Sequence, residues 1–241
     1  MRPILWLAVG LLFGLSDFLH PGLAGAIYGL VSDSVTRAPI GDAPVEVDFG
    51  YATSKIKTLP NGYYSCWLPE GRNYIVTIKK SGFETAVRKG VRVRPNDYTE
   101  VNIDLKCKTH KISKAAFLAA NGKYVRADEA RQGRVVADSA SLGPPETFTV
   151  IHLNGSKDQV ALRAPSGKFV CADLSAGAYL VADRKAVGDW ETFQMVHFDG
   201  AKTYLKSKKG YFVSADLDQG GRLIANRSAV KEWEIFSFIK K

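Results

Sequence analysis

The feature that most constrains the fold is a threefold internal repeat in the second half of the chain. A seven-residue motif, Gly-x-Tyr/Phe-Val-x-Ala-Asp, occurs at 122–128, 167–173 and 210–216. Its copies are 45 and 43 residues apart, and the same two offsets separate the phenylalanines that close each copy, Phe148, Phe193 and Phe236. Two independent motifs in one register predict three copies of one structural unit that pack around a shared core.

Each copy consists of short stretches in which apolar and polar residues alternate. In the second copy these stretches are 160–164, 169–173, 179–183 and 192–198. Alternation is typical of β-strands, and none of the stretches has the 3.6-residue period of a helix. Three four-stranded units close most simply into a β-trefoil, which leaves no open sheet edge, whereas a propeller usually needs four or more blades. We therefore predict a three-repeat β-trefoil over 112–241.

The part of the chain before the repeats also predicts β-structure. Alternating or apolar runs occur at 27–31, 44–49, 63–68, 74–78, 90–93 and 100–105. Turn-forming Pro, Asn, Asp and Gly residues separate them, as at 60–62 and 95–97. This pattern favours a seven-stranded β-sandwich over 27–105, followed by a Lys-rich linker over 106–111. The whole chain is thus expected to be all-β.

The sandwich segment resembles the carboxypeptidase regulatory-like, transthyretin-like family. The resemblance rests on Gly29-x-Val31-x-Asp33, on Asn61-Gly62-x-Tyr64 and on a longer pattern at 68–78. Arg37 and Asp42 depart from that family's usual glycines, and both lie in one loop. The resemblance implies a transthyretin/Ig-like sandwich that serves as a spacer, stability partner or display module and has no catalytic residues of its own.

The repeated segment looks like the fascin-like β-trefoil family, because each motif copy is followed by a closing motif of the type Trp-Glu-x-Phe. The resemblance covers about 112–241. Fascins bundle actin, but an exported chain with a single trefoil lacks the several domains that crosslinking needs. Actin-type binding is therefore implied by the resemblance only, and actin bundling is not expected. The Gln-x-Trp motif of ricin-type lectins does not occur in the chain, and a sugar site of that type is therefore not inferred.

The first 26 residues have the layout of a secretory signal peptide. Arg2 precedes an apolar run at 4–15, and the small residues Ala24-Gly25-Ala26 form an Ala-x-Ala cleavage site. Twelve apolar residues span only about 18 Å as a helix, too short for a bilayer core of about 30 Å. We therefore expect cleavage near Ala26, no permanent membrane span, and a secreted, extracellular or periplasmic protein.

The repeated motif also supplies the candidate ligand-binding residues. They are an aromatic and an aspartate from each copy, Tyr124, Asp128, Phe169, Asp173, Phe212 and Asp216. Three equivalent carboxylates beside aromatic rings suit sugar hydroxyls. A structural interpretation remains open, because an aspartate at the end of a strand also accepts hydrogen bonds from turn amides. Trp190 and Trp233 are expected to belong to the core.

The chain contains no pattern that predicts catalysis, a metal or a cofactor. There is no Gly-rich phosphate loop, nucleophile elbow or His-Glu-x-x-His motif, and the three cysteines lack zinc-site spacing. His152 and His197 are in register, but Lys240 takes the third place, and His110 stands alone in the linker. Enzymatic activity, for example by a small hydrolase, is therefore the minor alternative.

Two cysteines could in principle be joined. Cys66 and Cys107 have the strand parity of core residues, so a disulfide between them would close a 41-residue loop and add about 4 kcal/mol of stability. Two buried free thiols explain the same parity, and we prefer that interpretation because parity does not fix the distance between Cα atoms. Cys171 has no evident partner.

Positive charge is concentrated in the second half of the chain. Residues 27–105 have a net charge of +1, with 10 basic and 9 acidic residues, whereas residues 106–241 have +8, with 22 and 14. Two lysine clusters contribute, and they are Lys106, Lys108, Lys111 and Lys114 in the first and Lys202, Lys206, Lys208 and Lys209 in the second. Such clusters attract anionic polymers, although they also serve solubility.

Together these features predict a secreted, non-catalytic binding protein. Its trefoil is expected to recognise a polysaccharide or cell-surface glycan, or an anionic polymer, while the sandwich displays or stabilises the trefoil. Nucleic acid is not an expected partner. The alternative is an adhesion or structural protein whose trefoil binds a protein partner.

Overall fold

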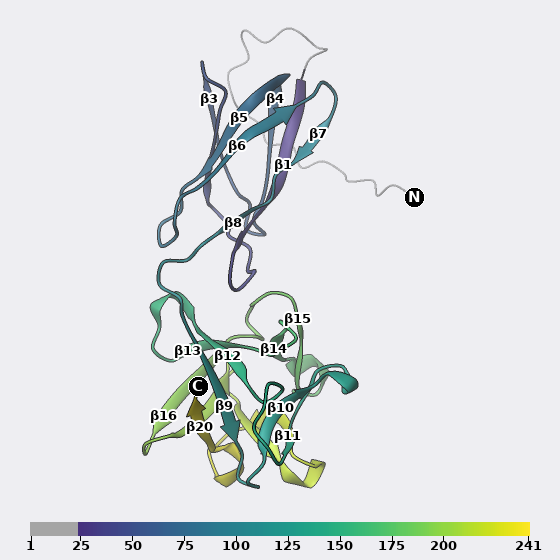
Figure 1. The fold of residues 1–241 in the computed structure, drawn as a ribbon, viewed down its shortest axis with the longest axis vertical. Helices are drawn as coiled ribbons and strands as arrows, with labels where there is room; N and C mark the ends of the chain where they lie inside the picture. The colour runs from purple at the N-terminus through teal and green to yellow at the C-terminus, as the bar shows by residue number, and fades with distance from the viewer. Residues whose placement is uncertain (1–23) are drawn as a thin grey trace.

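The computed structural model describes residues 24–241 as two β-domains that follow one another along the chain (Figure 1). The described part has β-strands and short 3-10 turns but no α-helix, which confirms the all-β prediction. It contains no helix long and apolar enough to span a membrane. Most of the predicted signal peptide, residues 1–23, lies outside the described residues.

The N-terminal domain is a sandwich of two four-stranded sheets. One contains β4-β1-β7 with β8 also paired to β1, and the other has the order β3-β2-β5-β6. The strands are β1 (Ala24–Asp33), β2 (Pro44–Asp48), β3 (Thr53–Lys57), β4 (Tyr63–Pro69), β5 (Gly71–Ile78), β6 (Ala86–Val93), β7 (Tyr98–Glu100) and β8 (Ile103–Leu105). Apolar side chains from both sheets fill the space between them, with Ile27, Val45, Val76 and Leu105 fully buried.

The sandwich has eight strands, not the seven predicted. Strand β3 was missed because Ile56 is its only apolar residue and the strand lies at a sheet edge. The predicted strand 100–105 is interrupted, and its two parts, β7 and β8, pair in parallel with different parts of β1. At the interruption Gly29 passes close to Val101, whose carbonyl oxygen would be 2.1 Å from an added Cβ.

The predicted cleavage point lies inside β1. Ala26 is 1% exposed, and its backbone N–H donates to the carbonyl of Asp97 at 3.0 Å. The backbone N–H of Asn96 donates to the carbonyl of Ala24 at 2.9 Å. Residues 24–26 are thus part of the sandwich.

The C-terminal domain is a β-trefoil built on a six-stranded barrel. Its barrel strands pair in the closed order β9-β12-β13-β16-β17-β20 and back to β9. These strands are β9 (Lys111–Leu118), β12 (Phe148–His152), β13 (Gln159–Arg163), β16 (Phe193–Phe198), β17 (Lys202–Ser207) and β20 (Phe236–Lys240). The core contains the predicted closing phenylalanines Phe148, Phe193 and Phe236, each at most 1% exposed.

Three hairpins form the cap of the trefoil, one from each repeat. They are β10 (Tyr124–Asp128) with β11 (Arg134–Ser139), β14 (Phe169–Ala172) with β15 (Leu180–Arg184), and β18 (Phe212–Asp216) with β19 (Arg222–Arg227). A 3-10 turn joins the strands of each hairpin, at Glu129–Arg131, Leu174–Ala176 and Leu217–Gln219. The valine and alanine of the repeated motif point into the core, as the alternation predicted.

Three equivalent backbone hydrogen bonds join these hairpins. Each has an alanine N–H as the donor, and the pairs are Ala137 to Gly221 (2.8 Å), Ala182 to Gly133 (2.7 Å) and Ala225 to Ala178 (2.8 Å). The three acceptor residues all have positive φ, at 76° for Gly133, 61° for Ala178 and 80° for Gly221. Glycine adopts a positive φ without strain, and the first and third repeats have glycine at this position. The second repeat has Ala178 there instead.

The segment between the domains packs at their junction. Backbone N–H of Glu84 donates to the carbonyl of Lys106, and Cys107 pairs with Phe83 through an isolated bridge. On the trefoil side, Val187 packs against the small cluster that contains Ile151 and Phe169, to which Val35 of the sandwich also packs. Cys66 and Cys107 are separate buried thiols, in line with the preferred interpretation.

Candidate functional site

The three repeated aspartates each pair with an arginine. Asp128 lies 3.2 Å from Arg126, and Asp173 lies 3.0 Å from Arg184. In the third repeat, Asp216 lies 3.5 Å from Arg227. Asp173 also accepts hydrogen bonds from the backbone N–H and the hydroxyl of Ser175, at 3.0 and 2.6 Å. All three aspartates thus hold an arginine in place, and Asp173 also organises the turn that follows it.

In the second and third repeats a buried glutamate approaches the same arginine. Arg184 Nε lies 3.6 Å from Glu191 Oε1, and Arg227 Nε lies 3.9 Å from Glu234 Oε1. The two glutamates are 6% and 3% exposed. The other oxygen of each accepts a backbone N–H at 2.8 Å, from Gly188 for Glu191 and from Lys231 for Glu234. These bonds fix both carboxylates, and through them the arginines.

A tryptophan precedes each of these glutamates in sequence and lies outside the core. Trp190 is 38% exposed, and the guanidinium carbon of Arg184 lies 5.9 Å from the centre of its ring. Trp233 is half-buried and lines a groove of about 520 Å³ together with Arg227, Lys231 and Glu232. The expectation that both tryptophans belong to the core is therefore wrong. In each of these two repeats the glutamate that follows the tryptophan takes the buried position instead.

The first repeat lacks this arrangement. Its counterparts of Arg184 and Trp190 are Ser139 and Pro145. Arg126, from the strand of the repeated motif, takes over the pairing, and its Nε lies 2.7 Å from Asp138. Two of the three repeats therefore have the combination of aspartate, arginine, glutamate and tryptophan, which we call the Trp–Arg sites.

The predicted aromatic residues are placed differently from one another. Phe169 is 1% exposed and belongs to the cluster at the domain junction, so its ring offers no open face. Tyr124 and Phe212 are half-buried at the surface. Phe212 contacts Tyr204, with ring centres 5.4 Å apart, and the ammonium group of Lys206 lies 5.0 Å from its centre. Ligand binding by the six predicted residues stays a prediction.

Sequence reasoning missed the arginines, glutamates and tryptophans of the Trp–Arg sites as functional residues. The signal was available, because Arg184 and Arg227 occupy the same place in their repeats, as do Trp190 and Trp233. These equivalent positions were not interpreted as a site, because a repeated tryptophan was expected to serve packing only.

Cys171 lies beside the Arg184–Glu191 pair, but its thiol is expected to be unreactive. Its side chain is buried, and burial raises the pKa of the thiol to about 12. A thiol with so high a pKa is protonated at neutral pH and is a poor nucleophile. Cys171 therefore contributes packing to the site.

His110 is buried at the domain junction and is not alone, contrary to expectation. Its Nε2 lies 3.1 Å from a carboxylate oxygen of Asp33, and its Nδ1 accepts the backbone N–H of Asn154 at 3.2 Å. Asp33, Cys107 and His110 bring potential metal ligands within 4.8 Å of one another. Because Nδ1 accepts the N–H of Asn154, a neutral His110 ring must have its proton on Nε2, which faces Asp33. One ring nitrogen thus bonds to the sandwich and the other to the trefoil.

Two further grooves lie at equivalent places on the trefoil barrel. One, of about 730 Å³, is lined by Thr147, Thr149 and Arg163 among others. The other, of about 290 Å³, is lined by their counterparts in the next repeat, Thr192, Gln194 and Lys206. Lysines from both predicted clusters line these grooves, Lys114 in the first and Lys206 and Lys208 in the second. Both grooves are therefore lined by basic and hydroxyl-bearing side chains.

Comparisons with family models agree with this architecture. Residues 26–106 match the carboxypeptidase regulatory-like domain, and residues 143–240 match the FRG1-like domain, a fascin-like β-trefoil. Both resemblances inferred from the sequence are thereby confirmed, each for its own domain. No curated protein sequence matched the chain.

Solved structures similar to the chain include three β-trefoil proteins of 16% sequence identity. A designed threefold-symmetric protein, ThreeFoil, covers 53% of this chain and 97% of its own, with a TM-score of 0.46. The match to SeviL bound to asialo-GM1 saccharide covers 54% of this chain and 98% of SeviL, with a TM-score of 0.44. The match to a Polyporus squamosus lectin bound to a sialylated human-type influenza-binding epitope covers 55% of this chain and 50% of the lectin, with a TM-score of 0.46.

The fold and the family matches define a two-domain all-β protein, in which a carboxypeptidase regulatory-like sandwich precedes a fascin-like β-trefoil. The first family is described as a regulatory-like domain and the second as an FRG1-like domain, and neither description is that of a catalytic domain. In the described trefoil, one groove is lined by Trp233 and Arg227, and two others are lined by lysine and threonine.

Proposed function

We propose that the trefoil is a non-catalytic module that binds carbohydrate of a cell surface or polysaccharide through its Trp–Arg sites. The observation that supports this most strongly is the exposed indole of Trp190 beside an arginine that is held by Asp173 and Glu191. Trp233 and Arg227 repeat the arrangement in the next repeat. On this proposal the sandwich is the display or stability module.

The chemistry of a sugar explains this choice of ligand. One face of a pyranose ring is made of C–H groups, which pack on an aromatic ring, while its hydroxyls need donors and acceptors of fixed orientation. An arginine has five N–H donors, and the ion pairs of Arg184 leave some of them available. Because Arg184 is already oriented by carboxylates, little further ordering is needed on binding.

The two Trp–Arg sites predict a specific experiment. Full-length protein is screened against soluble and insoluble polysaccharides at low and high salt, and then Trp190→Ala, Trp233→Ala and the double variant are compared. Each single change should weaken binding about tenfold, and the double variant should lose it, because stacking on an aromatic platform contributes about 1–2 kcal/mol. Tyr211→Ala, at an exposed aromatic of the same domain, is the matched control and should bind normally.

A second candidate is supported by the basic barrel grooves. If the ligand is an anionic polymer held by Lys114, Arg163 and Lys206, binding should fall steeply with salt and be insensitive to both tryptophan changes. A protein partner predicts no polysaccharide binding at all. Binding that survives 1 M salt and depends on the tryptophans would separate the carbohydrate proposal from both alternatives.

We also propose that the chain is exported and that its leader is removed before the sandwich begins. The apolar run and the small residues near 24–26 support export. Because Ala26 is paired within β1, processing after Ala24, with Gly22 as the other small residue, would keep the strand almost complete. The mass of the protein recovered from the culture medium tests this, and a secreted species that retains Met1 would contradict it.

A further inference from the structure

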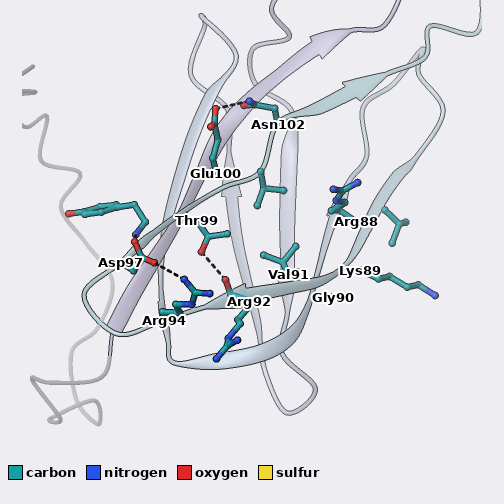
Figure 2. Close-up of a pocket in the computed structure, with 13 residues that line it drawn as sticks. Arg88, Lys89, Gly90, Val91, Arg92, Arg94, Asp97, Thr99, Glu100 and Asn102 are labelled. Atoms are coloured by element: carbon teal, nitrogen blue, oxygen red, sulfur yellow. Dashed lines mark hydrogen bonds and ion pairs between the residues drawn. The ribbon is translucent and has the colours of Figure 1, made fainter. Parts of the chain in front are cut away.

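The sandwich has a positively charged groove that the proposed function does not use. The groove has a volume of about 810 Å³ and is lined by residues 87–92 of β6, by residue 94 just after β6, and by residues 97–102 around β7. Figure 2 shows Arg88, Lys89 and Arg92 along the β6 side and Asp97, Thr99 and Glu100 on the other.

Positive charge is segregated at this groove. The sandwich segment is almost neutral, yet four of its ten basic residues fall between 88 and 94, and there is no acidic residue between Glu84 and Asp97. Arg94 pairs with Asp97 at 3.9 Å, while Glu100 accepts a hydrogen bond from Asn102 at 2.7 Å. In the described chain Arg88, Lys89 and Arg92 have no ion-pair partner.

The groove also contains an open strand edge. Among the described strands, β6 pairs only with β5, so its other edge has backbone groups without a strand partner. The carbonyl of Arg92 faces the groove and accepts a hydrogen bond from Thr99 Oγ1 at 2.8 Å, so a side chain, and not a strand, occupies this point of the edge (Figure 2). Free N–H and C=O groups of an edge strand accept another extended strand.

An aromatic pair lies at one end of the groove. Tyr98 lines it and is 61% exposed, and its ring packs edge-on against that of Trp67, which is 64% exposed, with ring centres 5.7 Å apart. Two large exposed rings in contact form an apolar platform beside the cationic side chains. At the other end Val87 is 51% exposed.

We propose that this groove binds an acidic peptide segment in extended conformation, which adds as a strand to the free edge of β6. Backbone hydrogen bonds would supply affinity, and carboxylates on alternate residues would meet the unpaired cations. An apolar residue of the peptide would rest on the Trp67–Tyr98 pair. A second copy of β6 is disfavoured as the occupant, because pairing two such edges would place like charges opposite each other.

Two synthetic peptides of identical charge test the strand-addition step. The first is a capped heptapeptide in which Glu alternates with Val and Thr, and the second is the same peptide with N-methyl groups on alternate backbone nitrogens. Titrations on the full chain should show saturable binding of the first, at least tenfold tighter than the second, because methylation removes the backbone donors but keeps every carboxylate.

Charge variants locate the binding site. Arg88→Glu/Arg92→Glu should weaken binding of the unmethylated peptide about thirtyfold or more. The control Lys157→Glu/Lys185→Glu, at two exposed lysines of the trefoil and with the same change in net charge, should alter it less than threefold. Circular dichroism and thermal melting verify that both variants are folded.

Three results would overturn the proposal. They are equal binding of the two peptides, equal loss in both charge variants, and tighter binding of a sulfated polysaccharide that competes with the peptide at the same residues. The absence of peptide binding would also overturn it and would leave the cations as protection against edge-to-edge aggregation. None of these results depends on the tryptophans of the trefoil, so the proposed function is tested separately.

Discussion

Both described sheets of the sandwich end in strands with an unpaired outer edge, β3 and β6 in one sheet and β4, β7 and β8 in the other. The barrel of the trefoil instead returns from β20 to β9 and closes. This difference decides what each domain can offer a ligand. An open edge presents backbone groups and suits an extended peptide, while a closed barrel can present only side chains on its outer surface. The cationic β6 edge and the Trp–Arg sites follow this division.

Two glycines of positive φ, Gly133 in the trefoil and Gly90 in the sandwich, differ in how closely other backbone atoms approach them, and this difference predicts the largest effect. An added Cβ at Gly133 of the trefoil would lie 2.4 Å from the carbonyl oxygen of Ala182. Gly133→Ala should therefore destabilise the trefoil by about 3 kcal/mol, through the clash and the positive φ together. Chemical denaturation followed by circular dichroism measures the change.

The matched change in the sandwich is Gly90→Ala. Gly90 also has a positive φ, at 72°, but an added Cβ would meet nothing within 4 Å. The loss there should be about 1 kcal/mol, from backbone strain alone. If the two variants were destabilised equally, the close approach in the trefoil would not be the cause.

A smaller effect is expected where the two domains meet. His110→Ala removes a partner from the buried carboxylate of Asp33 and from the backbone N–H of Asn154. Leaving these groups unpaired should lower the stability of the junction by about 2 kcal/mol. Limited proteolysis between 106 and 111 should become faster, and calorimetry should show the two domains melting more independently.

The neighbouring exposed lysine supplies the control for this variant. Lys108→Ala keeps the backbone bond from Lys108 to Gly82, so the junction should behave as in the unmodified chain. Equal proteolysis rates in the two variants would mean that His110 does not couple the domains.

Alkaline pH should act on the trefoil through Cys171. The pKa of this thiol is raised by burial from 9.0 to about 12. Between these values the unfolded chain has a thiolate and the folded chain does not, so the folded state loses stability as pH rises above 9. Cys171→Ala should make this loss shallower, as measured by denaturant midpoints between pH 7.5 and 10.5.

The sandwich provides the comparison for this pH effect. Burial also raises the pKa of Cys66, so Cys66→Ala should flatten the part of the pH dependence that belongs to the sandwich. An unchanged slope in the Cys171 variant would show that its thiol ionises as easily in the folded chain as in the unfolded one.

The smallest expected effect tests the threefold symmetry. Ala178 stands where the other repeats have Gly133 and Gly221, and it adopts a φ of 61°. Ala178→Gly should stabilise the trefoil by about 0.5–1 kcal/mol, because the left-handed conformation is strained for alanine. A loss of stability in thermal melts would show instead that the alanine methyl group contributes more through packing.

Both folds could be predicted from sequence because their patterns are periodic. The repeat offsets placed Phe148, Phe193 and Phe236 in one core, and alternation placed most strands of the sandwich. Strand β3 was missed because a polar edge strand has little apolar pattern. The split of β7 from β8 depends on a close approach at Gly29, which no local pattern encodes.

The candidate sites were harder to predict, because they depend on contacts between distant residues. His110 and Asp33 are 77 residues apart in the chain, and their hydrogen bond forms only when the domains pack. Likewise, Asp173 was recognised as a repeated residue, but its pairing with Arg184 depends on the registration of β14 with β15. Exposure of Trp190 follows from the burial of Glu191, which a hydropathy pattern would place at the surface.

The most direct test of the central claim is a calorimetric titration of the full chain with the polysaccharide that binds best in the screen. It is run at 150 mM and 1 M salt on three proteins, which are the unmodified chain, Tyr211→Ala and the double variant Trp190→Ala/Trp233→Ala. Salt-resistant binding that the double variant loses and the Tyr211 variant retains is the predicted result. Binding that all three proteins share, or that disappears at 1 M salt, would contradict carbohydrate recognition at the Trp–Arg sites.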